Sequence, residues 1–380
     1  MSTDTTYKES PVRRLEDLGQ SLWLDLLRRG MVDSGQLQDL IDDGLLGMTS
    51  NPTIFEKAID GSHDYDDAIR ALVLQGRSTV QIYDALTLED VQHAADVFRP
   101  VYDRLSGGDG FVSLEVSPYL ARDSQGTIDE ARKLWQQLDR PNTMIKVPAT
   151  REGLIAIEQL TSEGLNVNVT LLFGLPRYRQ VAEAYIAGLE ARAAQGKPLN
   201  HISSVASFFL SRIDTLVDPK LEEIMSAGGP DGKLAGWLHG QLAIASARVA
   251  YQIYHEIFGS ERFDRLADRG ARVQRLLWAS TSTKNPAYSD VRYVEALIGP
   301  ETINTVPLET FEAYRDHGDP ALRLEEGVDE ARERLESLSK LGIDLDQVTQ
   351  QLEDEGVEKF AKSLDQLMEA LRKRRDSISG

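Results

Sequence analysis

The sequence contains no cysteine among its 380 residues. This absence excludes disulfides, thiolate metal sites and a cysteine nucleophile. Positive charge is also scarce, because 42 Lys and Arg face 61 Asp and Glu, a net charge of −19. A nucleic-acid-binding protein needs a basic face that displaces counterions from phosphates. We therefore expect no nucleic-acid partner.

Long hydrophobic runs are missing as well. No stretch of about 18 consecutive apolar residues occurs, so we expect neither a transmembrane helix nor a membrane partner. The opening segment MSTDTTYKESPVRR (1–14) lacks the apolar core of a secretion signal. We expect a cytoplasmic protein whose polar first dozen residues are frayed. The hydrophobic content of 41% is sufficient for a packed core.

Short apolar runs alternate with longer segments of helical periodicity. Eight runs have the length and composition of strands: Ser21–Leu26, Leu46–Asn51, Phe111–Ser117, Thr143–Val147, Asn166–Leu172, His201–Ser207, Val273–Ser280 and Thr302–Pro307. Alternating strands and helices imply parallel strands with right-handed crossovers, and eight of them favour an α/β fold of the (β/α)₈ TIM-barrel type. The alternative is an open doubly wound sheet. That fold often has GxGxxG after its first strand, and the motif is absent.

Three helix starts carry capping signals. Ser78–Gln81 and Thr127–Glu130 have the spacing of capping boxes, in which two side chains satisfy free N–H groups at a helix start. Thr150 is an expected N-cap directly after the fourth predicted strand. These signals place helices between the strands, as the barrel requires.

Two regions exceed what a barrel needs. About 65 residues separate the sixth and seventh predicted strands, and they include a long helical pattern around Leu234–Phe258. The segment 321–380 is charged and helical in period, with interruptions near Gly342 and Gly356. Its heptads are too few for a separate coiled coil. We therefore predict a single domain over residues 1–380, with one or two C-terminal helices packed on the outside of the barrel.

Polar residues stand late in several apolar strands. Side chains alternate between the two faces of a strand, so residue parity separates the helix-covered face from the barrel interior. Active sites of these barrels form at the carboxyl ends of the strands. The pattern therefore predicts one site that contains Asp25, Asn51, Glu115, Lys146, Asn168 and Thr170.

This set of residues suits Schiff-base chemistry. A lysine among apolar residues loses charge stabilisation, so its neutral amine becomes available to attack a ketone. Asp25 and Glu115 can move the protons that imine formation and C–C cleavage require. Each residue also has a structural alternative: Lys146 reaching a rim, Glu115 forming its ion-pair partner, and Asp25 capping a turn.

Six segments, spread in order from the second strand to the seventh, resemble those of transaldolases. They are GMTSNPTIF (47–55), FVSLEVSP (111–118), TMIKVPAT (143–150), NVNVTLLF (166–173), SFFLSR (207–212) and LLWASTSTKNP (276–286). The length, the insertion and the C-terminal helices resemble the longer transaldolases of actinobacteria and cyanobacteria. The resemblance implies a transferase of the pentose phosphate pathway that needs no cofactor and no metal.

The resemblance also implies roles for the polar residues. Lys146 matches the Schiff-base lysine, and Asp25 matches the group that takes the proton from the substrate C4 hydroxyl. Glu115 matches an acid/base that acts through a water, which Thr170 helps to hold. Asn51 and Asn168 match the residues that bind the dihydroxyacetone part of the substrate.

The remaining matches concern the sugar and its phosphate. Ser207 and Arg212 match sugar- and phosphate-side contacts, Phe209 lines the pocket, and Ser280 matches a phosphate-binding serine. Shorter transaldolases have an arginine two residues after that serine, whereas this chain has Ser282. Lys284 is expected to supply the second phosphate charge. A solvated loop lysine is the alternative interpretation.

Other functions stay open at this stage. The same lysine would serve a simple aldolase, although related fructose-6-phosphate aldolases tend to have tyrosine where this chain has Phe209. A non-catalytic barrel used as a scaffold is the third possibility. We predict sugar phosphates as substrates and a monomer or homodimer. The six histidines show no paired spacing typical of a metal site.

Overall fold

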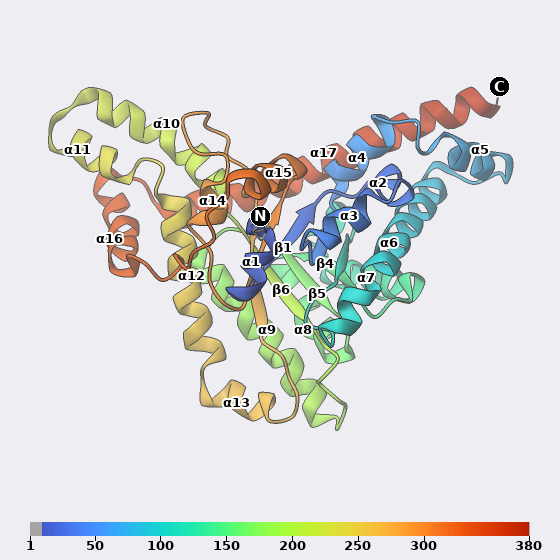
Figure 1. Cartoon of the computed structure of the whole chain (residues 1–380), viewed down its shortest axis with the longest axis horizontal. Helices are drawn as coiled ribbons and strands as arrows, with labels where there is room; N and C mark the ends of the chain where they lie inside the picture. The colour runs from blue at the N-terminus through green and yellow to red at the C-terminus, as the bar shows by residue number, and fades with distance from the viewer. Residues whose placement is uncertain (1–9, 380) are drawn as a thin grey trace, which may run out of the picture.

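The computed structural model describes residues 10–379 and contains a closed barrel of eight parallel strands (Figure 1). Each strand pairs with the next along the chain, and β1 pairs with β8 to close the barrel. The strands are β1 (Gln20–Asp25), β2 (Gly47–Thr49), β3 (Val112–Glu115), β4 (Thr143–Pro148), β5 (Val167–Leu172), β6 (Ser204–Phe209), β7 (Gln274–Ala279) and β8 (Thr302–Val306). The predicted TIM barrel is confirmed.

Helices between the strands surround the barrel. In chain order they are α1 (Pro11–Asp17), α2 (Arg29–Asp33), α3 (Gln36–Asp42), α4 (Pro52–Asp60), α5 (Asp66–Leu74), α6 (Thr79–Arg104), the 3₁₀ turn η1 (Pro118–Leu120), α7 (Ser124–Leu138), α8 (Arg151–Glu163), α9 (Leu175–Ala194), α14 (Arg292–Glu295) and α15 (Leu308–His317). Their apolar sides pack on the outward-facing residues of the strands and form one continuous core. None of the helices within residues 10–379 is both long and apolar enough to cross a membrane.

The eight predicted strands match the observed strands in order, with one clear shift. The sixth was expected to begin at His201, but β6 begins at Ser204. The backbone N–H of Ser203 donates to the side-chain oxygen of Asn166, at 2.9 Å, instead of to a neighbouring strand. The side chain of Asn166 thus takes the place of a backbone hydrogen bond between strands, and β6 begins later than predicted.

The expectation of a frayed first dozen residues is partly wrong. Residues 1–9 lie outside the described residues, but helix α1 begins at Pro11, and Val12 is buried. Pro11 stands in the first turn of the helix, where its missing N–H costs nothing. Val12 packs into the core, and this burial holds the helix against the barrel.

Two of the three capping predictions are confirmed. Ser78 and Gln81 form a reciprocal capping box at α6, and Thr150 caps α8 by accepting from the N–H of Gly153. The Thr127–Glu130 prediction is wrong, because the N-cap of α7 is Asp123, four residues before Thr127. Glu130 instead accepts from the backbone N–H of Ser117 at 2.6 Å, after β3.

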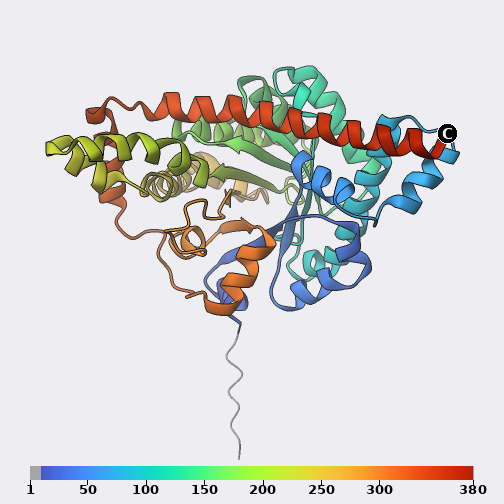
Figure 2. The same ribbon diagram turned by 90° about the horizontal axis from the view of Figure 1, so that it is seen from above.

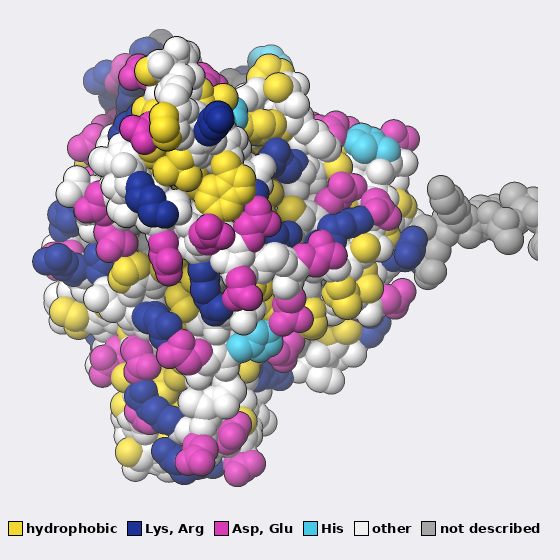
Figure 3. Space-filling model, turned by 90° about the vertical axis from the view of Figure 1, so that its left-hand side faces the viewer, with side chains coloured by type: hydrophobic (Ala, Val, Ile, Leu, Met, Phe, Trp, Pro, Cys, Tyr) yellow, Lys and Arg dark blue, Asp and Glu magenta, His cyan; other side chains and the backbone are white. Residues whose placement is uncertain are grey.

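The long insertion between β6 and β7 folds into four helices: α10 (Ser211–Ala227), α11 (Gly229–Leu238), α12 (Leu242–Phe258) and α13 (Glu261–Ala267). The pattern over Leu234–Phe258 is therefore not one helix. It breaks at Gly240, which has a left-handed φ of 67° and donates its N–H to Asp218 at 2.8 Å. On the face of the molecule formed by this insertion, acidic and basic side chains are intermixed (Figure 3).

The C-terminal segment forms α16 (Val328–Leu338), the turn η2 (Ser339–Leu341) and the long helix α17 (Leu345–Ser379). Gly342 separates them with a φ of 73°, as expected, but Gly356 does not interrupt α17. Figure 2 shows α17 as one helix that spans the molecule. It packs against α4, α5, α6, α10 and β5, and two of its side chains line a cavity at the carboxyl ends of the strands. It thus crosses this end of the barrel instead of joining the outer ring of helices.

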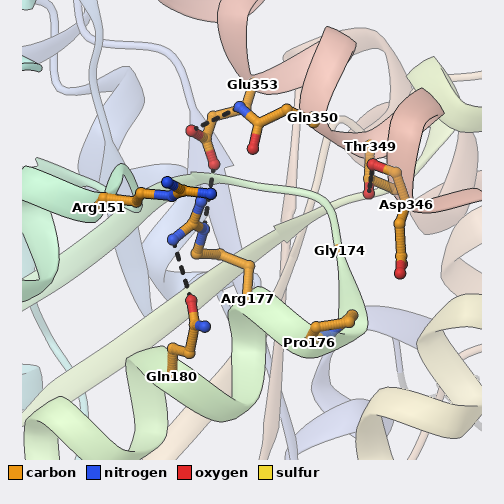
Figure 4. A pocket seen from close by; sticks show the side chains of 9 residues that line it. All are labelled: Arg151, Gly174, Pro176, Arg177, Gln180, Asp346, Thr349, Gln350 and Glu353. Carbon is orange, nitrogen blue, oxygen red and sulfur yellow. Dashed lines mark hydrogen bonds and ion pairs between the residues drawn. The ribbon is translucent and has the colours of Figure 1, made fainter.

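Ion pairs near both ends fasten α17. Near its start, the Nε atom of Arg177 lies 3.3 Å from an oxygen of Glu353, and both side chains are buried (Figure 4). Near its end, Arg374 contacts Asp66 of α5 at 3.2 Å. The portion of α17 between these contacts passes over the barrel.

Candidate active site

A cavity of about 280 Å³ opens at the carboxyl ends of the strands. Eight residues predicted for the site line it: Asp25, Asn51, Lys146, Ser207, Phe209, Arg212, Ser280 and Lys284. Three others, Glu115, Asn168 and Thr170, do not line it. Of the six residues that strand parity predicted, Asp25, Asn51 and Lys146 line the cavity; the other five lining residues were predicted from the transaldolase resemblance.

Lys146 is the most buried cation of this cavity. It projects from β4, and its residue is 4% exposed. Its Nζ atom donates to the backbone oxygen of Ser50 at 3.0 Å and lies 3.6 Å from an oxygen of Glu115. The register of β3 and β4 causes the second contact, because it places Glu115 directly beside Lys146. The amine is thus held at the bottom of the cavity with one carboxyl group next to it.

Burial raises the pKa of Glu115 to about 7. The positive charge of Lys146 opposes this rise, and the negative charge of Asp25 adds to it. The side chain is only 5% exposed, so its charged form loses most of its hydration. A carboxyl group with a pKa near neutrality can both accept and return a proton under physiological conditions.

Glu115 also borders a second cavity, of about 250 Å³, between α6, α7 and α17. Tyr83, Thr87 and Leu364 are among the residues that line it. Glu115 therefore lines this second cavity, while its neighbour Lys146 lines the first.

Asp25 ends β1, and a hydrogen-bonded pair of threonines holds it. Thr49 donates to Asp25 at 2.7 Å, and the hydroxyls of Thr49 and Thr305 are 2.9 Å apart. The register of β1 and β2 sets Asp25 beside Thr49. Because the carboxylate is fixed on a strand end, it has one orientation toward the cavity.

Asn51 is placed by the end of β2. The strand is shorter than predicted because Pro52 begins helix α4, and Asn51 becomes its N-cap. The side-chain oxygen accepts from the N–H of Ile54 at 3.0 Å. This bond turns the amide NH₂ group into the free donor of the side chain.

Asn168 lies in the interior of the barrel, fully buried. It donates to Ser113 at 3.0 Å and accepts from the hydroxyl of Ser207 at 2.7 Å. The second of these hydrogen bonds orients Ser207, which lines the cavity. The hydroxyl of Thr170 is also buried and has no hydrogen-bond partner within residues 10–379.

The outer part of the cavity is cationic. Arg212 lies over the ring of Phe209, 5.4 Å from its centroid, and burial lowers the pKa of this guanidinium. Ser280 adopts a left-handed φ of 54°, and its hydroxyl is 3.0 Å from that of Ser211. A serine in this strained conformation directly after β7 is a common feature of binding sites.

Lys284 reaches the cavity from the loop after β7 and donates to Ser282 at 2.5 Å. Burial lowers the pKa of Lys284, and the nearby charge of Glu309 opposes this change. The loop lysine is thus directed into the site and not only into solvent.

The structure adds residues that the sequence did not indicate. Lys57 of α4 and both Lys359 and Phe360 of α17 line the cavity, as do Thr49 and Thr305. Thr49 is the first residue of the TSNPT segment, so the motif could have indicated it. The two α17 residues had no signal, since the periodicity of a helix does not tell which part of the barrel it covers.

A family model described as transaldolase/fructose-6-phosphate aldolase matches residues 22–371. The chain belongs to this family. "Transaldolase 2" of Nostoc sp. is 48% identical over 363 residues, which cover 94% of this chain and 95% of the relative. The transaldolases of Trichodesmium erythraeum and Saccharopolyspora erythraea are also 48% identical, over 94% and 97% of this chain and over 95% and 98% of their own lengths.

The transaldolase resemblance found in the sequence is therefore confirmed over nearly the whole chain. The roles of individual residues stay predictions, because a family match does not test them. Ser282 lines the same cavity as cations from α4, α10 and α17. Within residues 10–379, no group of three or more His, Asp or Glu side chains is arranged to hold a metal ion.

Proposed function

We propose that this member of the transaldolase family transfers a dihydroxyacetone unit through a Schiff base on Lys146. The donor is sedoheptulose 7-phosphate or fructose 6-phosphate, and the acceptor is glyceraldehyde 3-phosphate or erythrose 4-phosphate. This reaction belongs to the pentose phosphate pathway. The observation that carries the proposal is the buried amine of Lys146, 3.6 Å from the carboxyl group of Glu115, at the bottom of the cavity that Asp25 lines.

The first step forms the imine. The amine of Lys146 attacks the C2 carbonyl of the ketose, and the carbonyl oxygen leaves as water. Glu115 lies close enough to exchange the necessary protons through one water molecule. Its raised pKa makes both directions of the exchange accessible near pH 7. Thr170, buried with an unpartnered hydroxyl, is the proposed ligand of that water.

The second step breaks the carbon–carbon bond. The carboxylate of Asp25 takes the proton of the C4 hydroxyl, the C3–C4 bond breaks, and the aldose phosphate leaves with its new carbonyl group. The bonding electrons stay on C3 as an enamine, which then attacks the aldehyde carbon of the acceptor. Thr49 fixes Asp25 for this step, while Asn51 and Ser207 offer hydrogen bonds to hydroxyls of the dihydroxyacetone part. Water finally hydrolyses the imine and releases the product ketose.

Trapping with borohydride tests this proposal. The protein is incubated with fructose 6-phosphate and borohydride, and the modified residue is located by mass spectrometry. We expect reduction of the imine to mark Lys146, and we expect turnover to need erythrose 4-phosphate or glyceraldehyde 3-phosphate as acceptor. Release of free dihydroxyacetone without acceptor would instead indicate a simple aldolase. Absence of any adduct would indicate a barrel without this catalytic function.

Sugar phosphates are the partners that this reaction requires. The intermixed charges on the face in Figure 3 support the absence of a nucleic-acid partner there. The cytoplasmic location and the monomeric or homodimeric state stay predictions.

A further inference from the structure

Four cations from four separate elements meet at the outer part of the cavity: Lys57 of α4, Arg212 of α10, Lys284 of the loop after β7 and Lys359 of α17. None of them forms a salt bridge within residues 10–379. The whole chain carries a net charge of −19, so unpaired cations gathered at one cavity run against its overall balance. Such an arrangement favours an anionic ligand.

These cations lie close enough to affect one another. Lys359 is an exposed residue, but its partial burial at the cavity lowers its pKa, and the charges of Arg212, Lys284 and Lys57 lower it further. Arg212 and Lys57 act on Lys284 in the same direction. The nearby carboxylates are those of Asp25, Glu309 and Glu355. A dianion between the four cations would relieve their repulsion.

The face of α17 that carries Lys359 is fixed over the barrel. Gly356, Lys359, Phe360 and Ser363 recur at the spacing that places residues on one side of a helix. A Cβ atom at Gly356 would lie 2.9 Å from a methyl group of Leu171, so glycine permits this close approach. Phe360 is buried, and the hydroxyl of Ser363 is 2.8 Å from that of Thr53. The rotation of α17 thus directs Lys359 to the cavity.

We propose that Lys359 of α17 binds the phosphate group of the sugar substrate, together with Arg212, Ser280 and Lys284. This inference rests on the proposed function, and it makes the long C-terminal helix part of the substrate site. Lys359 then supplies a positive charge to the cavity that the uncharged Ser282 also lines. The phosphate ester, in turn, joins α17 to the carboxyl ends of the strands, so substrate binding stabilises the position of this helix.

The test is a comparison of Lys359→Met with Lys373→Met. Methionine keeps most of the side-chain length and removes the charge. Lys373 lies on the same helix, 74% exposed and outside the cavity, so its variant is a matched control. We expect Lys359→Met to raise KM for fructose 6-phosphate about tenfold or more, with a small change in kcat. KM for unphosphorylated fructose should be unchanged, and Lys359→Arg should restore most of the affinity.

A binding measurement separates this inference from the proposed reaction. Calorimetry with inorganic phosphate, and separately with fructose 6-phosphate, is carried out on Lys146→Met protein with and without Lys359→Met. Neither titration requires turnover. A loss of about tenfold in affinity for both ligands supports the role of Lys359, even if the wild-type protein forms no borohydride adduct. Equal affinities in the two proteins, or an equal loss in Lys373→Met, would overturn it.

Discussion

The Nζ atom of Lys146 lies 3.6 Å from an oxygen of Glu115, and both side chains are 5% exposed. The distance is longer than a direct hydrogen bond but short enough for strong charge coupling. Adjacent strands β3 and β4 place the two residues side by side, so the barrel itself fixes this separation. A buried amine and a buried carboxyl group at this distance need only a small movement of one side chain to exchange a proton directly.

The raised pKa of Glu115 predicts the pH dependence of imine formation. The carboxylate must be ionised to take a proton, and its pKa of about 7 lies far above the ordinary value near 4.5. The ionised fraction therefore falls as the pH drops through 7, and the rate should fall with it. We expect the rate of borohydride trapping to show an acid limb with an apparent pKa near 7. Glu115→Gln should be slow at every pH and lack that limb; a limb that persists in this variant would assign it to another group.

Replacing Lys146 by methionine should abolish both adduct formation and turnover without unfolding the protein. Methionine has a similar volume and lacks only the nucleophile. Glu115 then loses the positive charge that lowers its pKa, so it becomes neutral instead of remaining an unpaired buried charge. Circular dichroism should match the wild type, and mass spectrometry should find no reduced adduct. Activity at the wild-type level would exclude the Schiff-base assignment.

Asp25→Ala should form the imine and stall before the carbon–carbon bond breaks. The proposed proton is that of the C4 hydroxyl, which matters only after the imine exists. Thr49→Val removes the hydroxyl that donates to Asp25 at 2.7 Å, and it should lower kcat more than it changes KM. Mass spectrometry of the trapped adduct measures imine formation, and the rate of aldose release measures cleavage of the carbon–carbon bond. The two measurements together separate these steps. A failure of Asp25→Ala to trap substrate would give Asp25 an earlier role.

The alternation of strands and helices was sufficient to predict the barrel. Parity predicted Asp25, Asn51 and Lys146 at the cavity, whereas the other predicted residues that line it came from the transaldolase resemblance. Strand ends were harder, because side chains decide them: Asn166 delays β6, and Pro52 shortens β2. The Thr127–Glu130 spacing fitted a capping box equally well, but Asp123 competes for the same helix start. A local sequence pattern shows which hydrogen bonds a residue could form. Tertiary packing then decides which of them it does form.

The path of α17 was the feature least accessible from sequence. Its apolar positions show that one face is buried, but not against which surface. Gly356 was interpreted as a helix break, whereas it is the position at which α17 approaches Leu171. Nothing in the sequence singles out Lys359 among the charged residues of this segment. Only the three-dimensional arrangement places it beside Arg212 and Lys284 at one cavity.

Asp109 lies at the opposite end of the barrel from the cavity. We expect its substitution to reduce stability strongly without affecting catalysis. One of its oxygens accepts from the indole N–H of Trp23 at 2.5 Å, and the other lies 2.9 Å from a nitrogen of Arg275. Removal of the carboxylate leaves the charge of Arg275 mostly buried and unpaired. Asp109→Ala should reduce the free energy of unfolding by about 3–5 kcal/mol, measured by urea denaturation, with kcat unchanged.

The matched control for that variant is Asp103→Ala. Asp103 pairs with Arg99 on the surface of α6, where both side chains are about half exposed. Its loss should cost about 1 kcal/mol or less. Similar effects of the two substitutions would show that the contacts of Asp109 contribute little beyond a surface pair.

Lys284 of the loop after β7 donates to the hydroxyl of Ser282. A phosphate dianion needs charged donors, and the ammonium group of Lys284 lines the same cavity as Arg212 and Ser280. Lys284→Ala should remove about 1.5–3 kcal/mol of binding, the range for hydrogen bonds to charged groups, or roughly ten- to a hundredfold in KM for fructose 6-phosphate. With unphosphorylated fructose the loss should be far smaller, because the phosphate contact is absent from both proteins. Steady-state kinetics on the two substrates decide the matter: an equal proportional loss on both, or no loss on either, would show that Lys284 does not bind the phosphate.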